Sequence, residues 1–483
     1  MTSLKPGAHV HLIGICGTAM ASLAGILKDL GYRVSGSDQN VYPPMSTQLE
    51  RLGIPIQTGY RSENLQPHPD LVIVGNVVSR TNPEVEALLA SDIPYTSLPR
   101  ALGEFVIGTR DSYVVAGTHG KTTTSSLLTW LTDAVGLEAG FLIGGIPLNY
   151  GVSFRAPKAT SFVIEGDEYD TAFFDKVPKF VHYRPKHVIL TSVEFDHADI
   201  YRDLDHVKSA FRQLLERIPP EGTLIYNGED KNIPDLLGAC RARTIVSYGE
   251  RSGDYVIADR AVLHGRNQFT VVKRGERVAD LALKIFGVHN SLNALAVFAL
   301  ADTLNWPRAR VLQAFADFKG VKRRQEWLGE VNGVTVIEDF AHHPTAVKLT
   351  LECMRERFPD RRIVAVFEPR SATSRRKVFQ KDYVEAFSAA DLTFVARPFD
   401  QSRIETQDRF SSEELIAELR KAGRTAETGD GADGLLSKMI PRVQSGDVVL
   451  IMSNGGFDGI YQKFLAQLAQ LPRPTPAPVL VRS

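Results

Sequence analysis

The chain has 483 residues, too many for a single hydrophobic core, and its length predicts about three domains. Its 56 Lys and Arg residues balance 56 Asp and Glu residues, so no net charge would attract a polyanion, and nucleic acid is not an expected partner. The three cysteines are far apart and form no Cys-x-x-Cys pair, which favours a reducing cytoplasm. No apolar run approaches the roughly 20 residues that span a bilayer, so no membrane association is expected.

Short β-branched runs followed by helical patterns recur along the chain, which predicts an α/β protein with parallel sheets. In chain order, the expected strands include residues 9–15, 71–74, 113–116, 162–164, 188–191, 334–337, 363–367, 392–395 and 448–452. The first run of alternating strands and helices ends before residue 111, which marks one domain boundary. A second boundary follows a helix expected over residues 290–304. We therefore predict a first domain over residues 1–110, a central domain over 111–320, a C-terminal domain over 321–470 and a flexible tail over 471–483.

The loop after the first expected strand contains Gly14, Cys16 and Gly17, and Asp38 follows 24 residues after Gly14. The position of this loop and its later acid resemble a dinucleotide-binding fingerprint, in which a diphosphate lies at a helix N-terminus. Cys16 and Ala19 stand where that fingerprint has glycine, which disfavours NAD.

A second glycine loop, residues 117–123 with the sequence Gly-Thr-His-Gly-Lys-Thr-Thr, is the strongest motif of the chain. It stands between an expected strand and an expected helix, so its backbone N–H groups can cradle phosphates. Lys121 can reach the β- and γ-phosphates, and the Thr122 hydroxyl can bind Mg²⁺. Val115 stands where the full motif has its first glycine, which disfavours an ordinary GTPase or kinase. The alternative is a helix-capping turn with a surface lysine.

Acidic residues and histidines follow two other expected strands. Glu165 follows the strand over residues 162–164, and His197 lies in the segment after residues 188–191. Open α/β sheets bind ligands at the carboxyl edge of their strands, where a hard cation that bridges phosphates needs oxygen ligands. Glu165 is therefore a candidate metal ligand unless its loop is merely solvated, and His197 is either a ligand or an exposed loop histidine.

Three further positions are candidates for ligand binding. Asn290 and Asn293 are three residues apart at an expected helix start, so their amides share one face, although Asn290 could simply cap the helix. Asp339 ends an expected strand and is followed by His342 and His343, which either bind a metal or phosphate or form a turn before a helix.

In this order, the motifs resemble the Mur ligases over about residues 9–468. The resemblance implies a Rossmann-like UDP-binding domain, a central P-loop-like ATPase domain and a C-terminal Rossmann-like domain. It also implies a ligase that forms carbon–nitrogen bonds with ATP and Mg²⁺ as cofactors.

The same resemblance implies roles for individual residues. The ATP-binding residues would be Gly117, Thr118, His119, Gly120, Lys121, Thr122, Thr123, Asn290, Asn293, Arg324 and Asp339. The metal ligands would be Thr122, Glu165 and His197, and the catalytic residues would be Lys121, Glu165, His197 and Arg324. The UDP-sugar would be bound by Gly14, Cys16, Gly17 and Asp38. Some Mur ligases have a carbamylated lysine after the metal histidine, and Lys208 is the candidate for that role.

Within the family, five stretches resemble the ligases that recycle murein peptides: residues 14–18, 41–47, 167–176, 368–371 and 452–457. Such enzymes join L-alanyl-γ-D-glutamyl-meso-diaminopimelate to UDP-N-acetylmuramate through an acyl phosphate. The resemblance implies this reaction in the cytoplasm and a peptide-binding role for Arg370. The alternatives are a ligase that adds a single L-alanine, a folate polyglutamylating ligase, an NAD-dependent oxidoreductase and a non-catalytic nucleotide-binding module.

Overall fold

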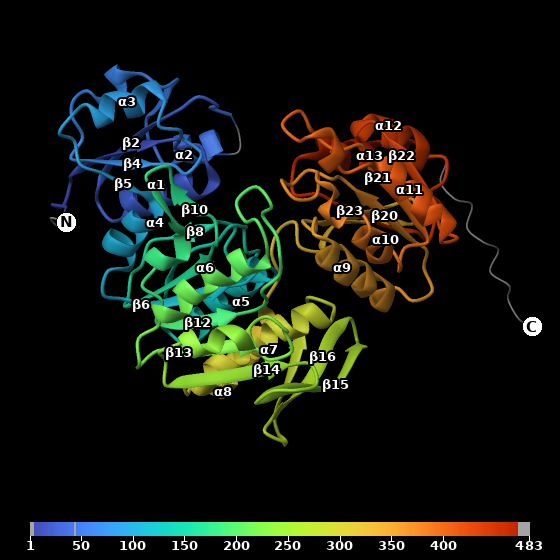
Figure 1. Cartoon of the computed structure of the whole chain (residues 1–483). Coiled ribbons are helices and arrows are strands. Elements are labelled where there is room, and N and C mark those ends of the chain that lie inside the picture. The colour runs from blue at the N-terminus through green and yellow to red at the C-terminus, as the bar shows by residue number, and fades with distance from the viewer. Residues whose placement is uncertain (1–3, 43–44, 472–483) are drawn as a thin grey trace, which may run out of the picture. The chain divides into compact units, whose positions relative to one another are not determined.

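The computed structural model describes residues 4–42 and 45–471, so the predicted flexible tail lies outside the described residues from 472 onward. The chain divides into two compact units, which are considered separately (Figure 1). The first unit consists of residues 1–195, 200–284 and 290–321, and the second of residues 196–199, 285–289 and 322–483. The predicted α/β fold is confirmed, since parallel strands alternate with helices in both units. None of the described helices is long and apolar enough to cross a membrane.

The N-terminal part of the first unit is a five-stranded parallel sheet with the order β3-β2-β1-β4-β5. Both faces of this sheet are covered. Val10 and Leu12 of β1 therefore pack into one hydrophobic core, and Ile13 packs into the other. Its elements are β1 (His9–Ile13), α1 (Thr18–Asp29), β2 (Arg33–Asp38), α2 (Met45–Arg51), β3 (Ile56–Thr58), η1 (Ser62–Leu65), β4 (Leu71–Val74), α3 (Pro83–Leu89), β5 (Tyr95–Ser97), α4 (Leu98–Ala101) and η2 (Leu102–Ile107).

The rest of the first unit contains a ten-stranded sheet with the order β17-β16-β15-β14-β13-β12-β6-β9-β7-β8. The middle of this sheet is parallel, as predicted, but β15, β16 and β17 are joined in antiparallel hairpins that the sequence analysis did not predict. The sheet strands are β6 (Asp111–Ala116), β7 (Gly140–Leu142), β8 (Phe154–Arg155), β9 (Ser161–Gly166), β12 (His187–Leu190), β13 (Thr223–Asn227), β14 (Thr244–Gly249), β15 (Tyr255–Leu263), β16 (Arg266–Lys273) and β17 (Glu276–Leu283).

Helices and one small hairpin complete this part of the chain. The helices are α5 (Lys121–Ala134), η3 (Lys179–His182), α6 (Leu204–Glu216), η4 (Pro234–Ala239), α7 (Val288–Thr303) and α8 (Arg308–Asp317). Strands β10 (Asp170–Ala172) and β11 (Asp175–Pro178) pair only with each other. Phe173 and Phe174, at the turn of this hairpin, pack on the core of the N-terminal sheet, where Phe174 meets Tyr95 edge-on at 5.1 Å between ring centroids.

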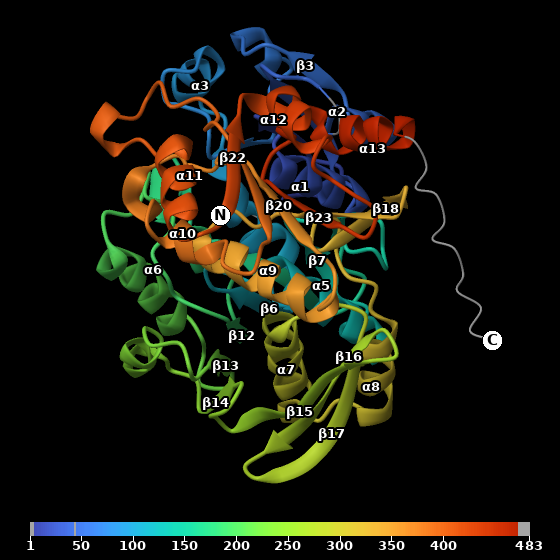
Figure 2. The ribbon, with the colours of Figure 1, turned by 90° about the vertical axis from the view of Figure 1, so that its right-hand side faces the viewer.

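The second unit is built on a six-stranded sheet with the order β18-β19-β23-β20-β21-β22, in which only β18 is antiparallel (Figure 2). Phe367 of β20 packs against Tyr383 and Phe387 on one face, while Val364 and Val366 face the core formed with α12 and α13. The elements are β18 (Glu326–Val331), β19 (Val334–Asp339), α9 (Pro344–Arg357), β20 (Ile363–Phe367), η5 (Lys377–Phe379), α10 (Asp382–Ala386), β21 (Leu392–Ala396), η6 (Thr406–Asp408), α11 (Ser412–Lys421), β22 (Thr425–Gly429), α12 (Gly431–Met439), β23 (Val448–Met452), η7 (Phe457–Gly459) and α13 (Ile460–Gln470).

A close backbone contact joins the two sheets of the first unit. A Cβ atom on Gly103, in η2, would lie 2.1 Å from the carbonyl oxygen of His182, at the end of η3. The side chain of His182 is held by Asp175, 2.9 Å away, which also pairs with Arg100 at 3.1 Å. Because a backbone oxygen cannot turn aside as a side chain can, this junction has room for glycine alone.

We expect Gly103→Ala to lower the melting temperature of the protein, because η2 and η3 must separate to admit the methyl group. Overpacking of this kind costs about 1–3 kcal/mol or more. The matched control is Gly238→Ala, since a Cβ atom on Gly238 would meet nothing within 4 Å. Differential scanning calorimetry of both variants would test the contact, and equal melting temperatures would contradict it.

Candidate active site

The glycine loop of residues 117–120 connects β6 to α5 and is packed tightly against the segment that follows β12. Gly117 has a φ of 132°, and a Cβ atom there would lie 2.2 Å from the Thr191 hydroxyl oxygen. The N–H of Thr118 donates to the carbonyl oxygen of Ser192 at 2.9 Å. Gly120 has a φ of 82° and no room for a side chain, because Asn293 lies against it. Residues 117 and 120 therefore have to be glycine for the loop to take this path.

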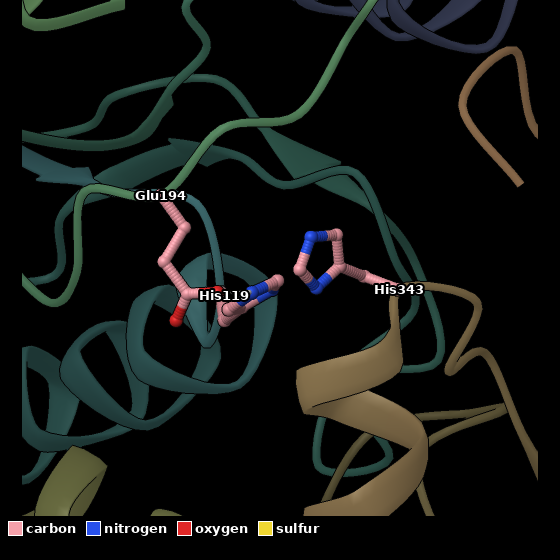
Figure 3. Close-up of side chains that lie close together, drawn as sticks. All are labelled: His119, Glu194 and His343. Carbon is pink, nitrogen blue, oxygen red and sulfur yellow. Dashed lines mark ion pairs between the residues drawn. The ribbon is translucent and has the colours of Figure 1, made fainter. Parts of the chain in front are cut away.

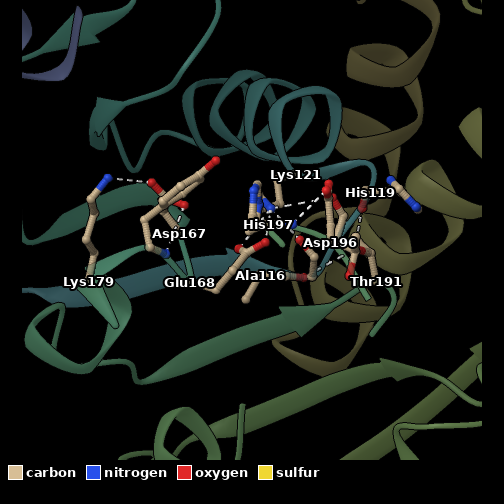
Figure 4. Close-up of polar contacts among 12 residues, drawn as sticks. Ala116, His119, Lys121, Asp167, Glu168, Lys179, Thr191, Asp196 and His197 are labelled. Carbon is tan, nitrogen blue, oxygen red and sulfur yellow. Dashed lines mark hydrogen bonds and ion pairs between the residues drawn. The ribbon is translucent and has the colours of Figure 1, made fainter. Parts of the chain in front are cut away.

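Lys121 is the first residue of α5, and its ammonium group turns back into the loop (Figure 4). Its Nζ donates to the carbonyl oxygen of Gly117 at 2.6 Å and to the Glu168 carboxylate at 3.0 Å. Burial lowers the pKa of Lys121, but the carboxylates of Glu168 and Asp167 outweigh burial, so the pKa is raised above its usual value. Lys121 therefore carries a positive charge, inside the loop where a phosphate would lie. The alternative of a surface lysine after a capping turn is wrong.

Glu168, which the sequence analysis did not select, is the acidic partner of Lys121. Its side chain is almost fully buried, and its carbonyl oxygen accepts a 2.6 Å hydrogen bond from the Tyr201 hydroxyl. Its neighbour Asp167 pairs instead with Lys179 at 2.7 Å (Figure 4). The acidic run 165–170 is visible in the sequence, but only burial distinguishes Glu168 from the other carboxylates.

Thr122 and Glu165 approach the same stretch of chain between β7 and β8. The Glu165 carboxylate accepts a hydrogen bond from the N–H of Gly144 at 2.9 Å. A Cβ atom on the next residue, Gly145, would lie 2.7 Å from the Thr122 methyl group. One hydroxyl and one carboxylate beside a phosphate loop are the oxygen ligands that a Mg²⁺ ion prefers, so these residues fit the predicted metal.

His119 also belongs to the glycine loop. Its ring lies 3.4 Å from the Glu194 carboxylate (Figure 3), and its carbonyl oxygen accepts a 2.5 Å hydrogen bond from the Thr191 hydroxyl (Figure 4). His343, also drawn in Figure 3, belongs to the second unit, where its ring caps α9 by accepting from the N–H of Thr345 at 3.3 Å.

Asn290 and Asn293 both lie in the first turns of α7, which begins at Val288. The alternative that Asn290 merely caps the helix is therefore wrong, since the helix begins two residues earlier. The Asn293 amide donates to the Asn290 side-chain oxygen at 3.3 Å, which confirms that the two amides share one face. The Asn293 side-chain oxygen would lie 2.6 Å from a Cβ atom on Gly120, so this pair adjoins the glycine loop.

His197 lies in a four-residue segment, 196–199, that belongs to the second unit. It has a φ of 55°, and its N–H donates to the Asp196 carboxylate at 2.7 Å. Asp196 also accepts a 2.6 Å hydrogen bond from the Thr373 hydroxyl. Burial raises the pKa of Asp196, but the charges of His197 and the pair His342–His343 outweigh burial, so its pKa lies well below the usual range. The role of His197 as a metal ligand stays a prediction.

Arg324 and Asp339 are close together in the second unit. Asp339 ends β19 and accepts hydrogen bonds from the N–H groups of Gln325 at 2.8 Å and Ala341 at 2.7 Å. Burial raises the pKa of Asp339, although the charge of Arg324 opposes this effect. The Arg324 guanidinium lies over the Phe340 ring, 4.6 Å from its centroid. The predicted roles of both residues in ATP binding remain predictions.

The loop after β1 holds the residues predicted to bind a UDP-sugar. Gly14 has a φ of 82°, and its N–H donates to the carbonyl oxygen of Ser37 at 2.8 Å. Asp38, at the end of β2, accepts a 2.9 Å hydrogen bond from the N–H of Cys16. Gly17 stands immediately before α1 as its N-cap residue. The structure thus brings Gly14, Cys16, Gly17 and Asp38 together at the carboxyl ends of adjacent strands, where such sheets bind ligands.

Lys208 lies within α6, where its ammonium group pairs with the Asp235 carboxylate at 2.9 Å. Carbamylation of Lys208 stays a prediction.

Three family models match successive parts of the chain: "Mur ligase family, catalytic domain" over residues 9–110, "Mur ligase middle domain" over 115–301 and "Mur ligase, glutamate ligase domain" over 323–455. A relative from Escherichia coli (strain K12), UDP-N-acetylmuramate--L-alanyl-gamma-D-glutamyl-meso-2,6-diaminoheptandioate ligase, is 41% identical over 96% of this chain and 98% of its own length. A UDP-N-acetylmuramate--L-alanine ligase from Clostridium tetani is 33% identical over 94% of this chain and 96% of its own. The crystal structure of a murein peptide ligase from Psychrobacter arcticus 273-4 is 37% identical, with a TM-score of 0.71, and covers 96% of this chain and 100% of that chain.

We expect Gly117→Ala to weaken nucleotide binding by at least about tenfold, because a methyl group at that φ would push the loop away from Thr191 and spoil the N–H cradle. Gly136→Ala, at the other end of α5, is the matched control: Gly136 also has a positive φ of 86°, but a Cβ atom there would meet nothing. Titration with a fluorescent ATP analogue would measure both affinities. Unchanged binding by Gly117→Ala would count against the loop as the phosphate site.

Proposed function

Because this chain belongs to the Mur ligase family, we propose that it joins L-alanyl-γ-D-glutamyl-meso-diaminopimelate to UDP-N-acetylmuramate with consumption of ATP. The same matches confirm the predicted three-domain architecture, while the boundaries at residues 110 and 320 remain predictions. The observation that carries the substrate proposal is the likeness, over nearly the whole chain, to the Escherichia coli relative. The proposed setting is peptidoglycan recycling in the cytoplasm.

The proposed reaction solves a chemical problem, which is that a carboxylate is a poor electrophile. Transfer of the γ-phosphoryl group of ATP to the muramate carboxylate gives an acyl phosphate and ADP. The free amine of the peptide then attacks the acyl carbon, and the tetrahedral intermediate collapses to the amide with loss of phosphate and a proton. Phosphoryl transfer depends chiefly on positioning and on neutralisation of charge.

The residues around the glycine loop have the charges for this task. Lys121 is cationic and lies within its own loop, so a bound phosphate could take the place of the Gly117 carbonyl oxygen as its partner. Thr122 and Glu165 would hold a Mg²⁺ ion, which when bound supplies further positive charge to the phosphates. Glu168 keeps Lys121 charged and oriented before the nucleotide arrives.

The proposed peptide pocket lies in the second unit, near Arg370. The peptide has several carboxylates, and a guanidinium pairs with a carboxylate through two parallel hydrogen bonds. Arg370 follows β20, at the carboxyl edge of the sheet where α/β domains bind ligands. Free L-alanine lacks the carboxylates of the second and third residues of the peptide, so the N–H groups of Arg370 that do not bind Glu368 would have no ligand partner, which supports preference for the whole peptide.

We expect Lys121→Ala to lower the ligation rate by about 10²-fold or more, because no neighbouring group replaces the charge that it presents to phosphate. The matched control is Lys179→Ala, since Lys179 is similarly buried and paired with an acid, Asp167, but lies outside the loop. The control variant should keep most of its activity. Phosphate release would be measured with all three substrates, and a Lys121→Ala enzyme with more than about a tenth of the wild-type rate would contradict the assignment.

We expect kcat/KM for the tripeptide to exceed that for L-alanine by about 10²-fold or more, because L-alanine lacks the peptide carboxylates to which Arg370 would donate charge-assisted hydrogen bonds. Arg370→Ala should remove most of this difference. Mass detection of the products formed from UDP-N-acetylmuramate, ATP and each amine would supply the measurement. Equal use of both amines by the wild-type enzyme would favour the single L-alanine reaction, for which the Clostridium tetani relative is named, and would leave the family assignment intact.

A further inference from the structure

The guanidinium of Arg370 lies over an aromatic ring and close to a glycine. Its Cζ atom is 3.8 Å from the centroid of the Phe399 ring. Gly455 is also close to the Arg370 side chain, since a Cβ atom there would lie 2.1 Å from Arg370 Cδ, 2.2 Å from Nε and 2.8 Å from Cζ. A side chain at residue 455 would therefore collide with the Arg370 side chain, and we call the space that the guanidinium occupies, over the Phe399 ring and beside Gly455, the slot.

One edge of the Arg370 guanidinium is held by an acid from the same strand end. Arg370 Nη1 donates to the Glu368 carboxylate at 3.2 Å. Glu368 is buried and also accepts a hydrogen bond from the Ser453 hydroxyl, whose oxygen in turn accepts from the N–H of Gly455 at 2.8 Å. Among residues 4–42 and 45–471, the bond to Glu368 is the only hydrogen bond that the Arg370 guanidinium donates. Its other N–H groups are therefore available to a ligand.

The slot is built from three adjacent strands of one sheet. Residue 455 follows β23, Arg370 follows β20 and Phe399 follows β21, and these strands are neighbours in that order. The N–H of Phe399 donates to the carbonyl oxygen of Pro369 at 3.2 Å, which ties the loop that carries the ring to the residue before Arg370. This hydrogen bond therefore holds the backbone of Phe399 beside the segment that carries Arg370.

Phe399 is 46% exposed, which alone would need no explanation, since single exposed aromatic residues are common. The Phe399 ring has a specific neighbour, because it lies over the Arg370 guanidinium. A free arginine side chain loses rotamer entropy when it is fixed, and a guanidinium that is already held in place has less to lose when it binds a carboxylate.

We propose that Phe399 is a positioning residue that sets the preference of the enzyme for a peptide carboxylate, by holding the Arg370 guanidinium flat in the slot closed by Gly455. This inference rests on the proposed function, which assigns the peptide to Arg370. Phe399 acts through Arg370 and takes no part in phosphoryl transfer. Its effect therefore falls on the KM for the peptide, not on kcat or on the KM values for ATP and UDP-N-acetylmuramate.

The test compares Phe399→Leu with Phe358→Leu. Both rings lie over an arginine, since Arg361 Cζ is 5.3 Å from the Phe358 centroid, but Phe358 precedes β20 and so lies at the opposite edge of the sheet. Loss of a cation–π contact predicts a rise in the tripeptide KM of about 5- to 30-fold for Phe399→Leu, with kcat and the melting temperature nearly unchanged. The Phe358→Leu enzyme should keep the wild-type tripeptide KM. Gly455→Ala, whose methyl group would displace the Arg370 side chain, should also raise the tripeptide KM.

A double-mutant cycle separates positioning from a general structural effect. Once Arg370→Ala has removed the guanidinium, adding Phe399→Leu should change kcat/KM for the tripeptide no further. A tripeptide KM unchanged in Phe399→Leu, or a full additional loss in the double variant, would overturn the role of Phe399 while wild-type use of the tripeptide still upheld the proposed function. Failure of the wild-type enzyme to use the tripeptide would overturn both.

Discussion

The parallel register of β6 with β9 and β12 is the constraint on which the candidate active site depends. Val115 pairs with Glu165 on one side, and Ala116 pairs with Leu190 on the other. The chain therefore leaves all three strands at the same edge, and the glycine loop, the acidic run and the 191–194 segment must share one small volume. This crowding explains why residue 117 is glycine, since the Thr191 hydroxyl occupies the place of any side chain. It also brings Glu165 beside the loop, although 44 residues separate it from Lys121 in the chain.

A buried positive charge is the second feature that organises the site. Lys121 would be costly to bury alone, and Glu168 compensates it at 3.0 Å. Glu168 stands at the base of the β10–β11 hairpin, whose turn residues Phe173 and Phe174 pack on the N-terminal sheet. The same short hairpin thus adjoins Lys121 of the glycine loop and packs on the sheet that is expected to bind the UDP-sugar.

Polar residues also gather at the carboxyl edge of the sheet in the second unit, but they are suited to a different ligand. Its central strands end in Asp339, in Glu368 and Arg370, and in the glycine-containing turn at residues 453–456. Buried Glu368 ties two of these strand ends together through Ser453. A planar guanidinium that lies over a ring is suited to recognition of a carboxylate, whereas the cationic lysine of the first unit is suited to phosphate.

Local patterns in the sequence were sufficient to predict the glycine loop, the β20 and β23 strands to the residue, and the set of polar residues that end the strands. These features depend on neighbouring residues: glycine permits tight turns, and β-branched runs form buried strands. Other features depend on residues far apart in the chain. The antiparallel β15–β17 extension, the pairing of Lys121 with Glu168 and the Phe399 ring over Arg370 arise only when the sheets form. In the sequence, Glu168 is one of several carboxylates and Phe399 is one of 24 phenylalanines. Only the tertiary structure decided which carboxylate is buried beside the lysine and which ring covers the arginine, because burial and contact are properties of packing between distant segments.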